Sequence, residues 1–318
     1  MQVRRILATL VATSAVLLAA ACAGDDLPEG SSGSDSPSAG ADKGAVKISG
    51  QNFPEATLVA SMYEQLLDDA GYDASTTLVD TRDVYMADGQ FPTGIQIVPE
   101  YVGGIVDFLN TTVNGQDAKA LTTSDPAASI DAAQSLLDDK GITLLDPSEA
   151  TDQNAFFVTK DFSEAQSVTK LSDLEGVSVV LAAAQDCTGR ADCEAGLKDV
   201  YGIDITEVLP LGYASADTFK SVLDNESQLG QTSTTDGTLE SQGLVLLEDD
   251  KAIQPAQNLV PAVSTEFLDA HPDVADTLNA LMAALTTEKL TELNASISVD
   301  REQPEAVAKK FLEDEGLL

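Results

Sequence analysis

The feature that most constrains this chain is an alternation of strand-like and helix-like segments that begins near residue 45. Residues 46–49 alternate apolar and polar side chains as a strand does, and residues 54–70 repeat apolar side chains at helical spacing until Gly71. Strands are predicted again at 76–79 and 95–98, with a short helical stretch between them. Strands that alternate with helices favour a parallel sheet covered by helices, so the expected fold class is α/β.

The rest of the chain predicts a second set of alternating elements and then a return to the first. Strands and helices continue to about residue 151, a second set fills residues 152–256, and helices dominate from residue 257 onward. A chain that builds one lobe, leaves it for another and returns is typical of two hinge-linked lobes with a ligand cleft between them. We therefore expect a first lobe of residues 45–151 and 257–318 and a second lobe of residues 152–256.

Some helix ends can also be predicted. Asp125 precedes an amphipathic helix at 127–139, and Gly141 follows it. Asn52 is a residue type that caps helices, and Pro54 suits the first turn of the helix that follows it.

The N-terminus has the pattern of an export signal. Arg4-Arg5 precedes the apolar run 6–21, which is too short for a comfortable membrane span and ends before Cys22. Small residues before this cysteine resemble the lipobox of bacterial lipoproteins, which implies removal of residues 1–21 and a lipid on Cys22. An ordinary cleavage site beside an incidental cysteine is the alternative. Residues 22–44, rich in Gly, Ser and Asp, predict a flexible linker, so we expect an extracytoplasmic protein anchored to the cell membrane by lipid.

Composition excludes several classes of function. The 318 residues contain 53 acidic and 17 basic side chains, a net charge of -36, which argues against a nucleic-acid partner. The single histidine, His271, precedes a proline at a predicted helix start and is expected at the surface. The sequence contains no His/Cys cluster for zinc, no Gly-rich phosphate loop and no nucleophile paired with a base. We expect no metal, no cofactor and no enzymatic activity, although a hydrolase that uses carboxylates alone stays open.

The segment from Gly94 to Gly104 is predicted to reach the ligand. Its apolar run is expected to end as a strand at Val98, because Pro99 has no N–H to give to a sheet. Ligands of open α/β sheets gather at the carboxyl ends of strands, where this segment carries Tyr101. The alternative is a strand followed by an ordinary tight turn.

Cys187 and Cys193 are predicted to form a disulfide. An exported chain enters an oxidising compartment, and a bond between these cysteines would rigidify the short loop that also carries Arg190. Two free thiols or a metal pair are the alternatives.

Six short segments resemble, in order, those of glycine betaine/choline-type substrate-binding proteins of ABC transporters. They are GQNFPE at 50–55, VPEYVGG at 98–104, NAF at 154–156, RADCEAGL at 190–197, TDG at 235–237 and PAV at 261–263. The resemblance implies a type II periplasmic-binding-protein fold, a small-molecule ligand, delivery to ABC permease subunits and a monomer. The alternative function is an exported enzyme or sensor domain on the same fold.

The resemblance also implies a binding site. The family traps a quaternary amine in an aromatic cage through cation–π attraction, and an arginine pairs with a ligand carboxylate where one is present. By motif, Tyr101 and Phe156 match cage aromatics, Arg190 matches the carboxylate-binding arginine, and Gln51 matches a polar contact in the first loop.

Three positions depart from the family pattern. Ser233, three residues before the expected ligand contact Asp236, and Gln257 stand where cage tyrosines are common, and Gly104 replaces a threonine. A cage that lacks two tyrosines predicts weak binding of glycine betaine and choline, and a preference for a ligand with further polar or aromatic groups.

Overall fold

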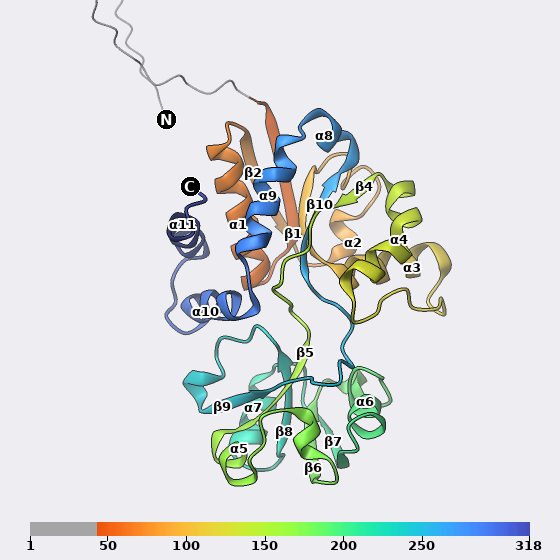
Figure 1. The fold of residues 1–318 in the computed structure, drawn as a ribbon, viewed down its shortest axis with the longest axis vertical. Helices are drawn as coiled ribbons and strands as arrows, with labels where there is room; N and C mark the ends of the chain where they lie inside the picture. The colour runs from red at the N-terminus through yellow and green to blue at the C-terminus, as the bar shows by residue number, and fades with distance from the viewer. Residues whose placement is uncertain (1–42) are drawn as a thin grey trace, which may run out of the picture. The chain divides into compact units, whose positions relative to one another are not determined.

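The computed structural model describes residues 43–318, which form two separate β-sheets with helices around each (Figure 1). The first sheet has the strand order β2-β1-β3-β10-β4, and the second has the order β7-β6-β8-β5-β9. The predicted α/β class is therefore confirmed. The predicted signal peptide, Cys22 and nearly all of the linker lie outside the described residues.

The first sheet contains β1 (Ala45–Gln51), β2 (Asp73–Val79), β3 (Ile97–Tyr101), β4 (Ile142–Leu144) and β10 (Leu259–Ser264). Its helices are α1 (Pro54–Asp69), α2 (Arg82–Tyr85), α3 (Val102–Asn114), α4 (Pro126–Lys140), α8 (Thr265–Ala270), α9 (Asp273–Ala284), α10 (Thr287–Ser298) and α11 (Pro304–Asp314). The second sheet contains β5 (Asn154–Thr159), β6 (Ser178–Ala183), β7 (Asp204–Pro210), β8 (Leu229–Ser233) and β9 (Leu244–Leu247). Its helices are α5 (Lys160–Gln166), α6 (Glu194–Asp199) and α7 (Ala216–Leu223).

Strand direction follows the route of the chain. β1 runs parallel to β2 and to β3, as the alternation of strands and helices predicts. β10 runs antiparallel to both β3 and β4, because it enters the first sheet from the second. The second sheet is mixed in the same way, since β6 is parallel to β7 and β8 whereas β5 is antiparallel to β8 and β9.

The prediction that the third strand stops at Val98 is wrong, because β3 continues through Pro99 to Tyr101. Pro99 lies opposite Pro261 of β10 in the antiparallel register. In such a ladder, alternate residue pairs exchange no hydrogen bonds, so a proline is tolerated there. The carbonyl of Pro261 points away from β3 and accepts from the backbone N–H of Leu145 at 3.0 Å. Proline therefore costs this strand no bond to β10.

Two predicted helix caps have different outcomes. Asp125 caps α4 as expected, since its Oδ1 accepts from the backbone N–H of Ala127 at 2.9 Å, and Gly141 ends the helix with a φ of 71°. Asn52 does not cap α1: the cap position is Phe53, without a side-chain bond. The backbone N–H of Asn52 instead donates to the carbonyl of Val79, which extends the β1–β2 ladder by one residue.

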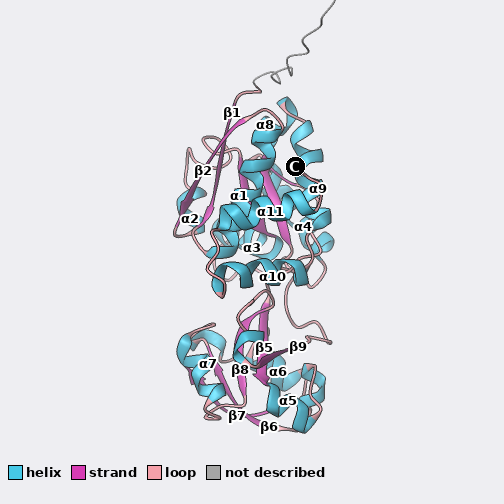
Figure 2. Ribbon diagram, turned by 90° about the vertical axis from the view of Figure 1, so that its left-hand side faces the viewer, coloured by secondary structure: helices cyan, strands magenta, loops and turns pink. Residues whose placement is uncertain are grey.

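Each sheet has helices on both faces, as Figure 2 shows for α7 and for α5 and α6 around the second sheet. Apolar side chains of α1, α9, α10 and α11 cover one face of the first sheet, and those of α2, α3 and α4 cover the other. In β5, Phe156 faces the core on the side of α6, whereas Phe157 faces the side of α7. No helix within residues 43–318 is long and apolar enough to cross a membrane.

The chain passes between the two sheets twice, and the two connecting segments lie side by side. Thr151 and Asn258 form an isolated antiparallel bridge, and the backbone N–H of Asp152 donates to the carbonyl of Gln257 at 3.1 Å. These contacts fix the backbone at Asp152, which lies just before β5 in the chain.

Candidate functional site

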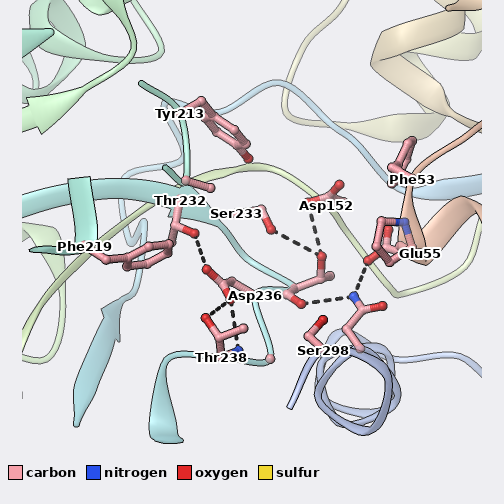
Figure 3. Close-up of a pocket in the computed structure, with 15 residues that line it drawn as sticks. Phe53, Glu55, Asp152, Tyr213, Phe219, Thr232, Ser233, Asp236, Thr238 and Ser298 are labelled. Carbon is pink, nitrogen blue, oxygen red and sulfur yellow. Dashed lines mark hydrogen bonds between the residues drawn. The ribbon is translucent and has the colours of Figure 1, made fainter. Parts of the chain in front are cut away.

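A cavity of about 600 Å³ is lined by 15 residues that come from segments of both sheets (Figure 3). The lining combines aromatic rings, carboxylates and hydroxyl groups. Its residues are Phe53, Pro54, Glu55, Asp152, Tyr213, Ala214, Phe219, Thr232, Ser233, Thr235, Asp236, Gly237, Thr238, Asn294 and Ser298.

Three aromatic side chains contribute to the wall. Phe53 precedes α1 and stacks on Tyr101 with ring centroids 6.3 Å apart, and Phe219 of α7 stacks on Phe157 at 5.0 Å. Each of these two rings is thus held from behind by another ring. Tyr213 precedes α7 and remains 45% exposed. Aromatic faces attract cations, and a half-exposed tyrosine at a cavity is available to a ligand.

The first carboxylate of the cavity, Glu55, is rigidly held. It lies in the first turn of α1, where the helix dipole favours a negative charge. Tyr101 donates from its hydroxyl to Glu55 Oε1 at 2.5 Å, and Asn294 donates from Nδ2 to Glu55 Oε2 at 2.6 Å. Burial and the neighbouring charge of Glu55 raise the pKa of Tyr101, so this tyrosine stays protonated and remains a donor.

The second carboxylate, Asp236, is also held by several donors. Its Oδ2 accepts from Thr232 Oγ1 at 2.5 Å, and its Oδ1 accepts from the backbone N–H and the hydroxyl of Thr238 at 2.9 and 2.7 Å. Asp236 therefore closes the turn between β8 and the segment that follows it, in addition to facing the cavity.

The third carboxylate, Asp152, interacts through hydrogen bonds only with the hydroxyls of Thr235 and Ser233 in the described part of the chain. Its Oδ1 accepts from Thr235 Oγ1 at 3.2 Å. Burial is the main cause that raises the pKa of Asp152 to about 7, and the charges of Glu55 and Asp236 raise it further, while nearby hydroxyls lower it in part. Near neutral pH this side chain changes charge, and a bound cation would favour its ionised form.

The charge of the cavity is one-sided. Among its 15 lining residues, all of them in the described part of the chain, none is a lysine, an arginine or a histidine. Within residues 43–318, no group of three or more His, Cys, Asp or Glu side chains is arranged to hold a metal ion. Carboxylates that surround a space without converging on one point suit an extended organic cation better than a metal ion.

The structure places two of the predicted ligand contacts, Ser233 and Asp236, in the wall of this cavity. Tyr101 lies one layer behind the wall, where it positions Glu55 through the hydrogen bond described above. Gln51 is the last residue of β1 and is not among the lining residues.

Gly104, Gln257 and Phe156 also lie outside the cavity wall. The backbone N–H of Gly104 donates to Gln257 Oε1 at 3.1 Å, so these residues join the start of α3 to the segment that precedes β10. Phe156 is 1% exposed in the core of the second sheet, because side chains of a strand alternate between its faces.

Arg190 is not in the cavity wall and is already paired with two carboxylates. Its Nε and Nη2 donate to the two oxygens of Asp192, at 2.9 and 2.5 Å, and its Nη1 donates to Asp186 at 2.9 Å. The structure also contains a disulfide between Cys187 and Cys193, which closes the loop that carries this arginine.

The sequence reasoning missed five important residues of the wall: Phe53, Glu55, Asp152, Tyr213 and Phe219. Phe53 and Glu55 belong to the segment 50–55 that resembles the binding-protein family, so a signal for them was available. Asp152, Tyr213 and Phe219 have no local signature, because only the approach of distant segments brings them together.

The fold and the cavity define a class of protein. Two α/β sheets joined by two adjacent connecting segments, with a polar and aromatic cavity lined from both, are the architecture of a solute-binding protein. The chain belongs to the family of substrate binding domains of ABC-type glycine betaine transport systems, which matches residues 44–314. Proteins of this family bind small ligands and deliver them to permease subunits; it is a family of transport proteins and not of enzymes.

Individual relatives agree with this assignment. A glycine-betaine-binding protein of Pseudomonas aeruginosa is 25% identical over 284 residues, which cover 86% of this chain and 88% of that protein. The glycine betaine-binding protein YehZ of Escherichia coli is 26% identical over 282 residues, which cover 85% and 90% of the two chains. The crystal structure of a glycine betaine/carnitine/choline ABC transporter protein has the same fold, with a TM-score of 0.73, 21% identity and coverage of 86% of this chain and 98% of that one.

Proposed function

We propose that this chain captures a small solute of the quaternary-amine class in the cavity around Asp152 and delivers it to an ABC permease. The observation that carries the proposal is the combination of three aromatic rings with three carboxylates in one cavity of about 600 Å³. A quaternary ammonium group cannot donate a hydrogen bond, so it is recognised by aromatic faces and by negative charge. Both are present in this wall.

The proposed contacts differ in part from those that the sequence predicts. Ser233 and Asp236 stay in the proposed site because they line the cavity. Phe53, Tyr213 and Phe219 take the place of Tyr101 and Phe156 as the proposed aromatic contacts. The expected weak binding of quaternary amines rested on missing cage tyrosines, and these three rings supply an alternative source of cation–π attraction.

The location and organisation of the protein form part of the same proposal. An export signal at residues 1–21, a lipid on Cys22 and a linker to residue 44 would hold a monomer at the outer face of the cell membrane. Lobe boundaries at 151/152 and 256/257 are supported by the bridge between Thr151 and Asn258, where the two connecting segments meet.

A thermal-shift panel on the purified protein tests the proposed ligand class. A ligand that binds only the folded state at 100 times its Kd stabilises that state by about 2.7 kcal/mol. We expect quaternary amines to raise the melting temperature and neutral sugars and dicarboxylates of similar size to leave it unchanged. Stabilisation by sugars or dicarboxylates alone would contradict the proposal.

A further inference from the structure

We infer that the ligand carries a net positive charge and no carboxylate, so that the cavity selects a choline-like cation over a zwitterion such as glycine betaine. This inference rests on the proposed function and narrows its ligand class. Its basis is the charge of the wall, in which Glu55, Asp152 and Asp236 face no basic side chain among the 15 lining residues.

Of the three carboxylates in the wall, Asp152 is the one best able to pair with a ligand cation. Each oxygen of Glu55 accepts from a neutral donor, and each oxygen of Asp236 does the same. Among residues 43–318, Asp152 interacts through hydrogen bonds only with the hydroxyls of Thr235, at 3.2 Å, and of Ser233. The ammonium group of a ligand is therefore expected beside Asp152, close to the half-exposed ring of Tyr213 that shares the wall with it.

A ligand carboxylate has no basic partner among the residues that line this cavity. Buried carboxylates are normally paired with a basic group or with several donors. Arg190 is bound to Asp186 and Asp192, and Arg82 donates from Nε and Nη2 to both oxygens of the buried Glu100, at 2.8 and 2.9 Å. Neither arginine lines the cavity. A second negative group would instead meet three like charges, which disfavours a zwitterion relative to a simple cation.

The hydrogen bonds of Asn294 also bear on the polar groups of the ligand. Asn294 lines the cavity and donates from Nδ2 to Glu55 Oε2 and to the carbonyl of Thr235, which fixes the orientation of its amide. Its Oδ1 is buried and, within residues 43–318, accepts no hydrogen bond. The polar atoms beside Asn294 are thus mostly acceptor oxygens, which makes this part of the wall poorly suited to a ligand carboxylate.

Isothermal titration calorimetry with three probes of similar shape tests the inference. Choline has the trimethylammonium group and a hydroxyl, glycine betaine has the same cation with a carboxylate, and 3,3-dimethylbutan-1-ol replaces the charged nitrogen of choline by carbon. We expect choline to bind at least roughly tenfold more tightly than either of the others, which corresponds to about 1.4 kcal/mol.

The other outcomes separate the inference from the proposed function. Glycine betaine that binds as tightly as choline would overturn the cation inference and leave the quaternary-amine proposal standing. If 3,3-dimethylbutan-1-ol bound as tightly as choline, the cavity would recognise the shape of the ligand and not its charge, and the cation inference would be overturned. No binding of any probe at concentrations on the order of 10 mM would count against both.

A pair of variants tests whether Asp152 is the source of the preference for a cation. Asp152→Asn is expected to weaken choline binding by roughly tenfold or more and to change binding of 3,3-dimethylbutan-1-ol little, because only the cation loses a charge partner. Asp88→Asn, at an exposed position outside the cavity wall, is the matched control and should leave both affinities unchanged. An unchanged ratio of choline to 3,3-dimethylbutan-1-ol affinity in Asp152→Asn would refute the assigned role of Asp152.

Discussion

Choline binding should weaken strongly as the pH falls from 8 to 5, because a bound monocation requires an ionised Asp152. The pKa of Asp152 is raised to about 7, mainly by burial and then by the charge of Glu55. The groups that face it from the surrounding elements are Glu55 of α1, Asp236 of the turn after β8, and the rings of Tyr213 and Tyr101. Choline itself keeps the same charge over this range.

The size of the effect follows from the ionised fraction of Asp152. With a pKa of about 7, roughly nine molecules in ten are ionised at pH 8 and about one in a hundred at pH 5. If the neutral side chain binds tenfold more weakly, as expected for Asp152→Asn, the apparent Kd should rise about eightfold, and if only the ionised state binds the cation it should rise about 90-fold, which is about 2.7 kcal/mol. Calorimetry at several pH values measures this change, and buffers of different ionisation enthalpy report the proton that is released on binding.

Asp152→Asn provides the control for this titration. The variant should bind choline weakly at every pH, with the pH dependence largely removed. A wild-type Kd that changes less than about threefold between pH 8 and pH 5 would refute the reasoning, as would an unaltered pH profile in the variant.

Ionisation of Asp152 destabilises the unliganded folded protein, whereas ionisation of a carboxylate in an ion pair stabilises the folded state. Between the unfolded pKa of about 3.9 and the folded pKa of about 7, the folded state of Asp152 holds more protons than the unfolded state. The free energy of unfolding therefore falls as the pH rises through this window. Above pH 7, Asp152→Asn should be more stable than the wild type by on the order of 1 to 4 kcal/mol, so its loss of binding would not be a loss of folding.

Three further predictions concern other parts of the chain. Tyr213→Ala should weaken choline binding by roughly 0.5 to 2 kcal/mol without loss of stability, because this ring is 45% exposed, whereas Leu223→Ala, at a position 47% exposed outside the cavity wall, should change nothing in the same calorimetric titration. Replacement of Cys187 and Cys193 by serine should lower the free energy of unfolding by about 2 kcal/mol, measured by denaturant titration, and two alkylatable thiols in the native wild-type protein would contradict the bond between them. Cys22→Ser should move the protein from the membrane fraction to the soluble fraction after cell fractionation, and a variant that stays in the membrane fraction would refute the lipid anchor.

The sequence alone determined the local elements and the family. Alternation of strand and helix periodicity predicted the α/β class, and Asp125 and Gly141 marked the ends of α4 correctly, because caps depend on the residues next to them. Six short segments in order indicated the substrate-binding family that the match over residues 44–314 confirms. These features require no knowledge of which segments meet in space.

The tertiary structure decided the strand directions and the composition of the candidate site. Pro99 is tolerated inside β3 because it pairs with Pro261, from a strand far along the chain, at a position where the two strands exchange no hydrogen bonds. Phe156 enters a core and Arg190 pairs with its own loop, although both occur in segments that resemble the family's binding motifs. A side chain's direction depends on which face of a sheet is covered, and a carboxylate's pKa depends on how deeply other segments bury it. Asp152 acquires both its place in the cavity and its raised pKa only when segments distant in sequence bury it and, to a smaller extent, bring the charges of Glu55 and Asp236 near it.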